Sequence, residues 1–219
     1  VTGNPIVDII NDNQKIFDSG GEYLDNKILD FINNDNFALA TSHRRENILN
    51  IKSLSNIVNL LNCSDSKIIF PMGYRTQKML KEFSLELNSN ILVIDPIGYL
   101  EFIYLMKKSD FVFSDSGTVV EEACILGKPS IQMRHSTERP EVYDVGSSVK
   151  FDPTFEIEDF ELYINKVNKL IPKKWKQPFG DGNASQNIVN DLVELSTTET
   201  FFKHSRNDYS YDVSNAFKE

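Results

Sequence analysis

Residues 111–122, with the sequence FVFSDSGTVVEE, decide the fold. The apolar run Phe111-Val112-Phe113 has the length of a short strand, and Asp115-Ser116-Gly117 supplies turn-forming residues directly after it. From Val119 onward, apolar residues recur at helical spacing until Gly127 ends the pattern. The stretch therefore predicts a buried strand, a tight turn and a helix in immediate succession.

The same alternation runs through most of the chain. Further strands are predicted at residues 37–40, 67–70, 91–94, 130–133 and 148–151. Helices are predicted at about residues 48–61, 79–83, 100–105, 157–171 and 184–195, and the first 35 residues predict a linker with one amphipathic helix. Because the strands are apolar on both faces, helices should cover both faces of the sheet. The pattern predicts an α/β fold, a Rossmann-like doubly wound parallel sheet.

Composition limits the class of protein. The chain has 219 residues, of which 40% are hydrophobic and 25% charged, as in ordinary globular domains. The net charge of -9 argues against a general nucleic-acid binder, and no apolar run approaches membrane-spanning length. Cys63 and Cys124 lack metal or disulfide spacing, which indicates reduced thiols in a cytoplasmic protein. Val1-Thr2-Gly3-Asn4-Pro5 has no initiating Met and no signal-peptide pattern, so we expect a piece of a longer protein.

The predicted strand ends suggest a ligand site, because doubly wound sheets bind ligands at their carboxyl edge. Residues 43–47, 95–98 and 115–118 lie there. The helix start at Ser116-Gly117-Thr118 suits a phosphate, through its free amides, its dipole and two hydroxyls. Glu122, one turn on, can accept hydrogen bonds from a ribose diol. The alternative is that Ser116 or Thr118 only caps the helix.

Three other motifs are rich in polar groups. The first, residues 41–47, places His43 after a strand and before Arg44 and Arg45, which suits a departing phosphate. Its alternative is an exposed loop in which Asn47 caps a helix. The second, residues 134–141 (RHSTERPE), is most simply a solvated loop. The third, residues 178–185, reads by itself as a turn before a helix cap.

In their order and spacing, these motifs closely resemble the non-hydrolysing UDP-N-acetylglucosamine 2-epimerases. The resemblance covers about Val1 to Leu195. The matching stretches are residues 1–5, 42–47, 95–106, 114–122, 127–129, 137–141 and 180–185.

The resemblance implies one half of a GT-B-like enzyme, whose active site lies in the cleft between two Rossmann-type domains. Residues 1–36 would be the interdomain crossover and helix, 37–195 the UDP-binding carboxy-terminal domain, and 196–219 a polar tail. Family members eliminate UDP to form a glycal and add it back after reprotonation, without a metal or redox cofactor. The carboxylates thought to transfer the protons belong to the amino-terminal domain, which is missing from this chain.

The resemblance also assigns roles to single residues. His43 matches the active-site histidine near the departing pyrophosphate, and Glu122 the ribose ligand. Phe102 matches a residue near the uracil, and Arg139 the arginine of the cleft. The substrate-binding set is Arg44, Phe102, Ser116, Gly117, Thr118, Glu122 and Arg139.

Two motifs differ from the sequences that are common in this family, and the differences indicate which subgroup the chain resembles. The phosphate loop is Ser116-Gly117-Thr118 where Ser-Gly-Gly is common. Pro71-Met72-Gly73 lacks the Pro-x-His whose histidine helps bacterial members hold a second, activating sugar nucleotide. The Thr form, with Arg75-Thr76-Gln77-Lys78, is closer to relatives that act on 6-deoxy-N-acetylhexosamines, such as those making UDP-N-acetyl-L-fucosamine.

Two alternatives stay open. One is the hydrolysing relative, which releases free N-acetylmannosamine and UDP. The other is the nucleotide-binding half of a GT-B glycosyltransferase, because fold alone does not fix function. The expected partners are a UDP-sugar nucleotide and the missing amino-terminal domain, with a homodimer when the protein is full-length, no nucleic acid and no membrane. The expected setting is cell-surface polysaccharide biosynthesis.

Overall fold

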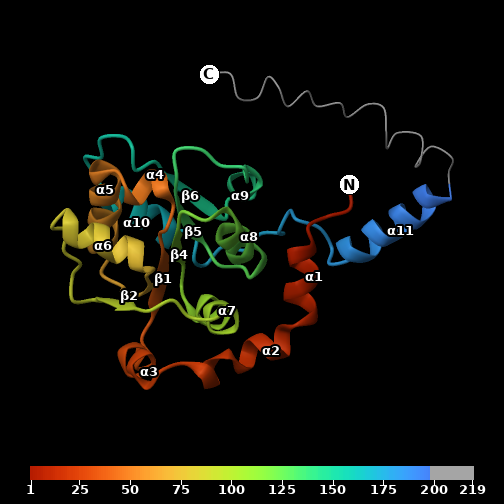
Figure 1. Cartoon of the computed structure of the whole chain (residues 1–219), viewed down its shortest axis with the longest axis horizontal. Coiled ribbons are helices and arrows are strands. Elements are labelled where there is room, and N and C mark those ends of the chain that lie inside the picture. The colour runs from red at the N-terminus through yellow and green to blue at the C-terminus, as the bar shows by residue number, and fades with distance from the viewer. Residues whose placement is uncertain (198–219) are drawn as a thin grey trace, which may run out of the picture. The chain divides into compact units, whose positions relative to one another are not determined.

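A six-stranded parallel sheet organises the described part of the chain, residues 1–197 of this computed structural model (Figure 1). The strands are β1 Phe37–Thr41, β2 Lys67–Pro71, β3 Ile91–Ile94, β4 Val112–Ser114, β5 Ser130–Met133 and β6 Ser148–Phe151. Their order is β3-β2-β1-β4-β5-β6, and every neighbouring pair is parallel. This confirms the predicted α/β Rossmann-like sheet. The order reverses between β1 and β4, which is where such sheets bind ligands.

Helices cover both faces of the sheet (Figure 1). One face carries α4 Arg45–Ile48, α5 Ile51–Asn62, α6 Tyr74–Glu82 and α10 Glu161–Asn168. The other carries α7 Tyr99–Lys108, α8 Gly117–Ile125 and α9 Glu141–Asp144. The four inner strands are buried on both sides, and Ala38, Ile68, Phe113 and Ile131 are fully covered. The edge strands β3 and β6 are only partly buried.

Several predicted helices differ in extent from the structure: α6 begins five residues earlier than the helix predicted at 79–83, and α7 extends three residues beyond the one predicted at 100–105. The helix expected over residues 48–61 is split into α4 and α5, because Asn50 starts a new helix and its side chain accepts a hydrogen bond from the Ser53 amide (3.0 Å). The helix expected over 157–171 is shorter, and α10 spans Glu161–Asn168. No helix among the described residues is long and apolar enough to cross a membrane.

The opening segment is more structured than predicted. Instead of a linker and one helix, it forms α1 Pro5–Asp12, α2 Gln14–Asp18, a 3-10 helix (η1) Ser19–Tyr23 and α3 Asn26–Ile32. Phe17 is buried, and η1 packs on α7. A Cβ atom at Gly20 would lie 2.5 Å from the backbone oxygen of Leu100, so this close approach requires glycine. Within the sheet unit, α2 and η1 pack on α7, which periodicity over such short elements does not reveal.

Two compact units make up the chain. Residues Ile10–Phe179 form the sheet unit, and Val1–Ile9 with the segment from Gly180 onward form the second. In the second unit, the Asp8 carboxylate accepts hydrogen bonds from the amides of Ala184 and Ser185 (3.1 and 2.7 Å) at the start of α11, Ala184–Ser196. The motif at residues 178–185 therefore leads into a helix that a distant aspartate caps.

The predicted roles of segments 1–36, 37–195 and 196–219 stay a prediction. Of the predicted polar tail, residues 198–219 lie outside the described residues.

Candidate functional site

Asp115 joins the ends of β1 and β4. Its side chain is fully buried directly after β4 and accepts hydrogen bonds from the Ser42 hydroxyl (2.9 Å), the His43 amide (3.0 Å), the Arg44 amide (2.9 Å) and the Asn47 side-chain amide (3.2 Å). Ser42, His43 and Arg44 lie in the turn that follows β1, and Asn47 lies in α4 directly after that turn. The carboxylate therefore fixes this segment beside the start of α8 and joins residues that are 68 to 73 positions away in the sequence.

His43 is a surface residue on this turn. Its side chain is 58% exposed, and its Nδ1 lies 3.6 Å from a carboxylate oxygen of Asp115. Asn47 does not cap a helix, as the alternative reading required. Its buried amide donates to Asp115 and to the Met133 carbonyl (2.9 Å), and Arg44 occupies the N-cap of α4. The turn is held rigidly while its imidazole faces solvent, which suits contact with a ligand.

The start of α8 has features of an anion-binding site. Ser116 occupies the N-cap, yet its side chain makes no capping hydrogen bond, so the capping alternative does not explain this serine. The Ser116 amide donates to the Ser114 hydroxyl (2.9 Å), Gly117 is buried and Thr118 is exposed. First-turn amides have no partner within their own helix, and the helix dipole makes this end positive. The arrangement can hold a phosphate group.

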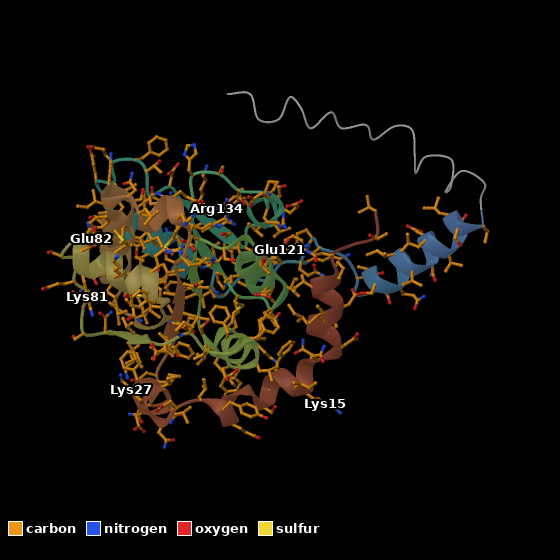
Figure 2. The ribbon with its side chains drawn as sticks, viewed as in Figure 1. Lys15, Lys27, Lys81, Glu82, Glu121 and Arg134 are labelled. Atoms are coloured by element: carbon orange, nitrogen blue, oxygen red, sulfur yellow. The ribbon has the colours of Figure 1, made fainter. Side chains whose placement is uncertain are left out.

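Residues 134–141 fold over the start of α8. Arg134 is buried and donates two hydrogen bonds to the Glu138 carboxylate (2.7 and 3.2 Å), while Arg139 forms an ion pair with Glu121 of α8. A Cβ atom at Gly117 would lie 3.7 Å from a carboxylate oxygen of Glu138. Hydrogen bonds from Arg134 lower the pKa of Glu138 to about 2. The segment is therefore an ordered part of the site and not merely a solvated loop; Figure 2 labels Arg134 and Glu121 on the side of the sheet unit that carries α8.

Glu122 is a buried carboxylate on the second turn of α8. Only 3% of the residue is exposed, and one of its oxygens accepts a hydrogen bond from the Tyr99 hydroxyl (2.7 Å) at the start of α7. Burial raises the pKa of Glu122 to about 7; the neighbouring charge of Glu121 acts in the same direction and the Tyr99 hydrogen bond acts against it. The carboxylate is thus costly to keep ionised, which is common at functional sites.

Phe102 lies three residues after Tyr99 and is half-buried on α7. Residues three apart share one side of a helix, so Phe102 lies on the side of α7 from which Tyr99 reaches Glu122. No contact in the described residues joins it directly to His43 or Ser116.

Two cavities among the described residues lie in other parts of the sheet unit. One of about 450 Å³ is lined by Asp25, Gln77 and the segment Asp95 to Ile97, among others, and another of about 510 Å³ by residues of α3 and by Lys108. None of the eight predicted site residues lines either cavity. Of the three strand ends expected to bind ligand, two meet at the β1–β4 switch point and the third, after β3, borders the first cavity.

Sequence reasoning missed two functional contributors. Asp115 was recognised as part of a motif, but its role as the acceptor for the β1 turn was not, since the donors are far away in sequence. Tyr99 lies within the stretch 95–106 that matches the family, but it was given no role. Its place at a helix start after Gly98 is too common to identify a functional residue.

Comparison with known proteins places these features in a family. The sequence profile of the family described as UDP-N-acetylglucosamine 2-epimerase matches residues 1–193. A UDP-N-acetylglucosamine 2-epimerase of Methanocaldococcus jannaschii is 38% identical over 206 residues, which are 88% of this chain and 54% of the relative. One of Methanococcus maripaludis is 40% identical over 204 residues, covering 87% of this chain and 53% of the relative. The chain therefore spans about half the length of these relatives.

Solved structures agree with this match. The M. jannaschii enzyme in complex with UDP-GlcNAc and UDP superposes with a TM-score of 0.72 at 40% identity, covering 89% of this chain and 54% of that one. The Neisseria meningitidis enzyme bound to UDP-GlcNAc gives a TM-score of 0.63 at 30% identity, covering 89% of this chain and 55% of that one. Such neighbours are GT-B-type epimerases, as expected for one half of a GT-B-like enzyme. With the family profile matched over residues 1–193, the chain belongs to the UDP-N-acetylglucosamine 2-epimerase family.

Proposed function

We propose that this chain is the UDP-binding half of a UDP-N-acetylhexosamine 2-epimerase that acts by eliminating and re-adding UDP. The observation that carries the proposal is the junction at Asp115, whose carboxylate binds the backbone amides of His43 and Arg44 directly before the helix start at Ser116. An exposed imidazole, a cation and a ring of helix-start amides meet at one edge of the sheet. That combination suits a diphosphate whose charge grows as its bond to the sugar breaks.

In this proposal, the diphosphate lies against Ser116, Gly117 and Thr118. Glu122 on the next turn accepts hydrogen bonds from the ribose hydroxyls, and Phe102 on α7 lies near the uracil. These assignments are supported by the burial of Glu122 close to the helix start and by the complexes of two relatives with UDP-GlcNAc or UDP. Arg139, held by Glu121, adds positive charge near the same helix.

The chemistry would be shared with residues outside this chain. His43 and Arg44 stabilise the departing and returning UDP, while the proton transfers at carbon 2 of the sugar belong to carboxylates of the other half. We therefore expect the 219-residue chain to bind UDP weakly and to turn over no substrate by itself. The whole protein, in this proposal, acts in the cytoplasm as a homodimer and supplies amino sugars for cell-surface polysaccharides.

Two measurements test the proposal. Calorimetry with UDP should detect weak binding to the chain, and a coupled epimerisation assay should detect turnover only in the full-length protein. Epimerisation by the chain alone would contradict the division of labour. Product analysis distinguishes the alternatives: a UDP-sugar indicates the non-hydrolysing enzyme, free N-acetylmannosamine with UDP indicates the hydrolysing one, and transfer to an acceptor indicates a glycosyltransferase.

A further inference from the structure

The contact between Tyr99 and Glu122 joins two helices. The Tyr99 hydroxyl at the start of α7 donates to one carboxylate oxygen of Glu122 on α8 (2.7 Å). Within residues 1–197, this is the hydrogen bond that the structure gives to the Glu122 carboxylate. A carboxylate has about four acceptor positions. Glu122 therefore retains the capacity to accept hydrogen bonds from a ligand.

Tyr99 is itself held in place. Its ring meets Phe17 of α2 edge to face, with the ring centroids 5.8 Å apart and an interplanar angle of 81°. Phe17 is 2% exposed, so the aromatic pair has one rigid member. An aromatic ring anchored in this way can deliver its hydroxyl to a fixed point at little further cost in conformational entropy.

The charges around Glu122 explain why this hydroxyl matters. Glu121 precedes Glu122 on α8 and carries a like charge, while Arg139 reaches the helix from residues 134–141 but pairs with Glu121. Tyr99 is the group from α7 that faces the carboxylate. A hydrogen bond donated to the ionised carboxylate favours that form over the neutral acid. Without this hydrogen bond, burial and the charge of Glu121 would raise the pKa of Glu122 further.

We propose that Tyr99 is a positioning residue that aims the Glu122 carboxylate at the ribose diol of the nucleotide and thereby makes the site selective for ribonucleotides. The inference rests on the proposed function, since it requires a uridine nucleotide at the start of α8. Tyr99 acts through Glu122: it fixes the carboxylate in one orientation and keeps it an acceptor, so that both ribose hydroxyls can donate to it. A nucleotide without those hydroxyls gains nothing from this arrangement.

The test removes only the Tyr99 hydroxyl. Tyr99→Phe keeps the ring that packs on Phe17, and Tyr163→Phe on α10 is a control that removes a tyrosine hydroxyl elsewhere in the sheet unit. Calorimetry with UDP and with 2′,3′-dideoxy-UDP compares ligands that share the base and the diphosphate. We expect Tyr99→Phe to weaken UDP about tenfold, as for loss of a charge-assisted hydrogen bond, and to leave dideoxy-UDP unchanged.

The pH dependence separates positioning from a merely structural role. The diphosphate groups of UDP and dideoxy-UDP ionise over the same pH range, so their effect on binding cancels when the two affinities are divided. The ratio of the UDP affinity to the dideoxy-UDP affinity therefore reports on the ribose diol alone. In the unmodified chain this ratio should rise with pH through about 7, where Glu122 ionises. Tyr99→Phe removes a hydrogen bond that lowers the pKa of Glu122, so in this variant the affinity ratio should rise at a higher pH. Above that pH, the variant should lose less UDP affinity relative to the unmodified chain.

A double variant tests whether Tyr99 acts through Glu122. In a Glu122→Gln background, which removes the charge, adding Tyr99→Phe should cause no further loss of UDP affinity. Equal weakening of UDP and dideoxy-UDP by Tyr99→Phe, or full UDP affinity in that variant, would overturn this inference while leaving the proposed function intact. Failure of the unmodified chain to bind UDP would overturn both.

Discussion

Two buried carboxylates, Asp115 and Glu122, lie near opposite ends of one short segment but have different surroundings. Asp115, after β4, is fully buried and accepts hydrogen bonds from two backbone amides, a hydroxyl and a side-chain amide. Glu122, on α8, is 3% exposed and accepts one from Tyr99. Burial raises the pKa of Glu122 to about 7. A carboxylate with several donors builds structure, whereas one with spare acceptor positions is available to a ligand.

The comparison teaches how to read acidic residues at the carboxyl edge of a sheet. Burial alone does not separate the two, because both are almost inaccessible. The number of hydrogen-bond donors distinguishes the two carboxylates, because each donor offsets part of the free energy needed to remove the charge from water. We therefore expect substitutions at the two positions to change different properties.

The largest expected effect is that of Asp115→Ala on folding. The substitution leaves the amides of His43 and Arg44 and the buried side chains of Ser42 and Asn47 without their acceptor, so the free energy of unfolding should fall by at least about 3 kcal/mol. Urea denaturation followed by circular dichroism measures it. Asp65→Ala, at an exposed aspartate before β2, is the control and should change little. If Asp115→Ala lowered the free energy of unfolding no more than Asp65→Ala does, Asp115 would not be a structural carboxylate.

His43→Ala should have the next largest effect, on turnover in the complete enzyme. Its ring is 58% exposed and is positioned by the Asp115 turn, so the substitution should lower kcat about 100-fold, as for loss of a general acid or charge-stabilising group. The free energy of unfolding should change by less than about 0.5 kcal/mol, as at an exposed position. Steady-state kinetics and denaturation, run on the same preparation, give both numbers. Loss of folding together with turnover would make His43 a structural residue.

Glu122→Gln should weaken UDP about tenfold, because the neutral amide is a poorer acceptor for the ribose diol than a carboxylate. Phosphate affinity should be unchanged, and calorimetry with the two ligands checks the difference. Equal weakening of UDP and phosphate would contradict the ribose assignment.

The stability of the same variant should respond to pH in a defined direction. The pKa of Glu122 is raised from 4.5 to about 7 in the folded state, so its ionisation favours unfolding. The contribution of the neutral Glu122 to stability is fully present below a pH of about 4.5 and is lost as the pH rises through about 7, by on the order of 3 kcal/mol. Glu122→Gln should remove this part of the decline. Identical pH profiles for the two proteins would show that burial does not penalise the charge.

Glu138→Gln should have the smallest effect on stability. The contribution of Glu138 should depend on pH in the opposite direction to that of Glu122. Hydrogen bonds from Arg134 lower the pKa of Glu138 from 4.5 to about 2, so the pair stabilises the fold above about 4.5 and this contribution is lost as the pH falls toward 2. The Glu138 side chain is 59% exposed, and solvent screening keeps the effect small. Denaturation midpoints of Glu138→Gln and the unmodified chain should converge at acidic pH. If the difference between the two midpoints were the same at every pH, the ion pair between Arg134 and Glu138 would not contribute to stability.

Much of the fold could be predicted from the sequence because its strands are continuous apolar runs that end in turn residues. The six predicted strands agree with β1 to β6 to within one residue at either end. The short elements α2 and η1 were missed because they are stabilised by packing on α7 and not by their own periodicity. Predicting the Asp115 network and the Tyr99 contact would have required knowing which segments, up to 73 residues apart, become neighbours.

A crystal structure of the chain with UDP would show directly where the nucleotide binds. We expect the ribose hydroxyls to lie within hydrogen-bond distance of Glu122, and the diphosphate to contact the amides at the start of α8 beside His43. A nucleotide bound instead in the cavity bordered by Asp25, Gln77 and Asp95 would contradict this expectation.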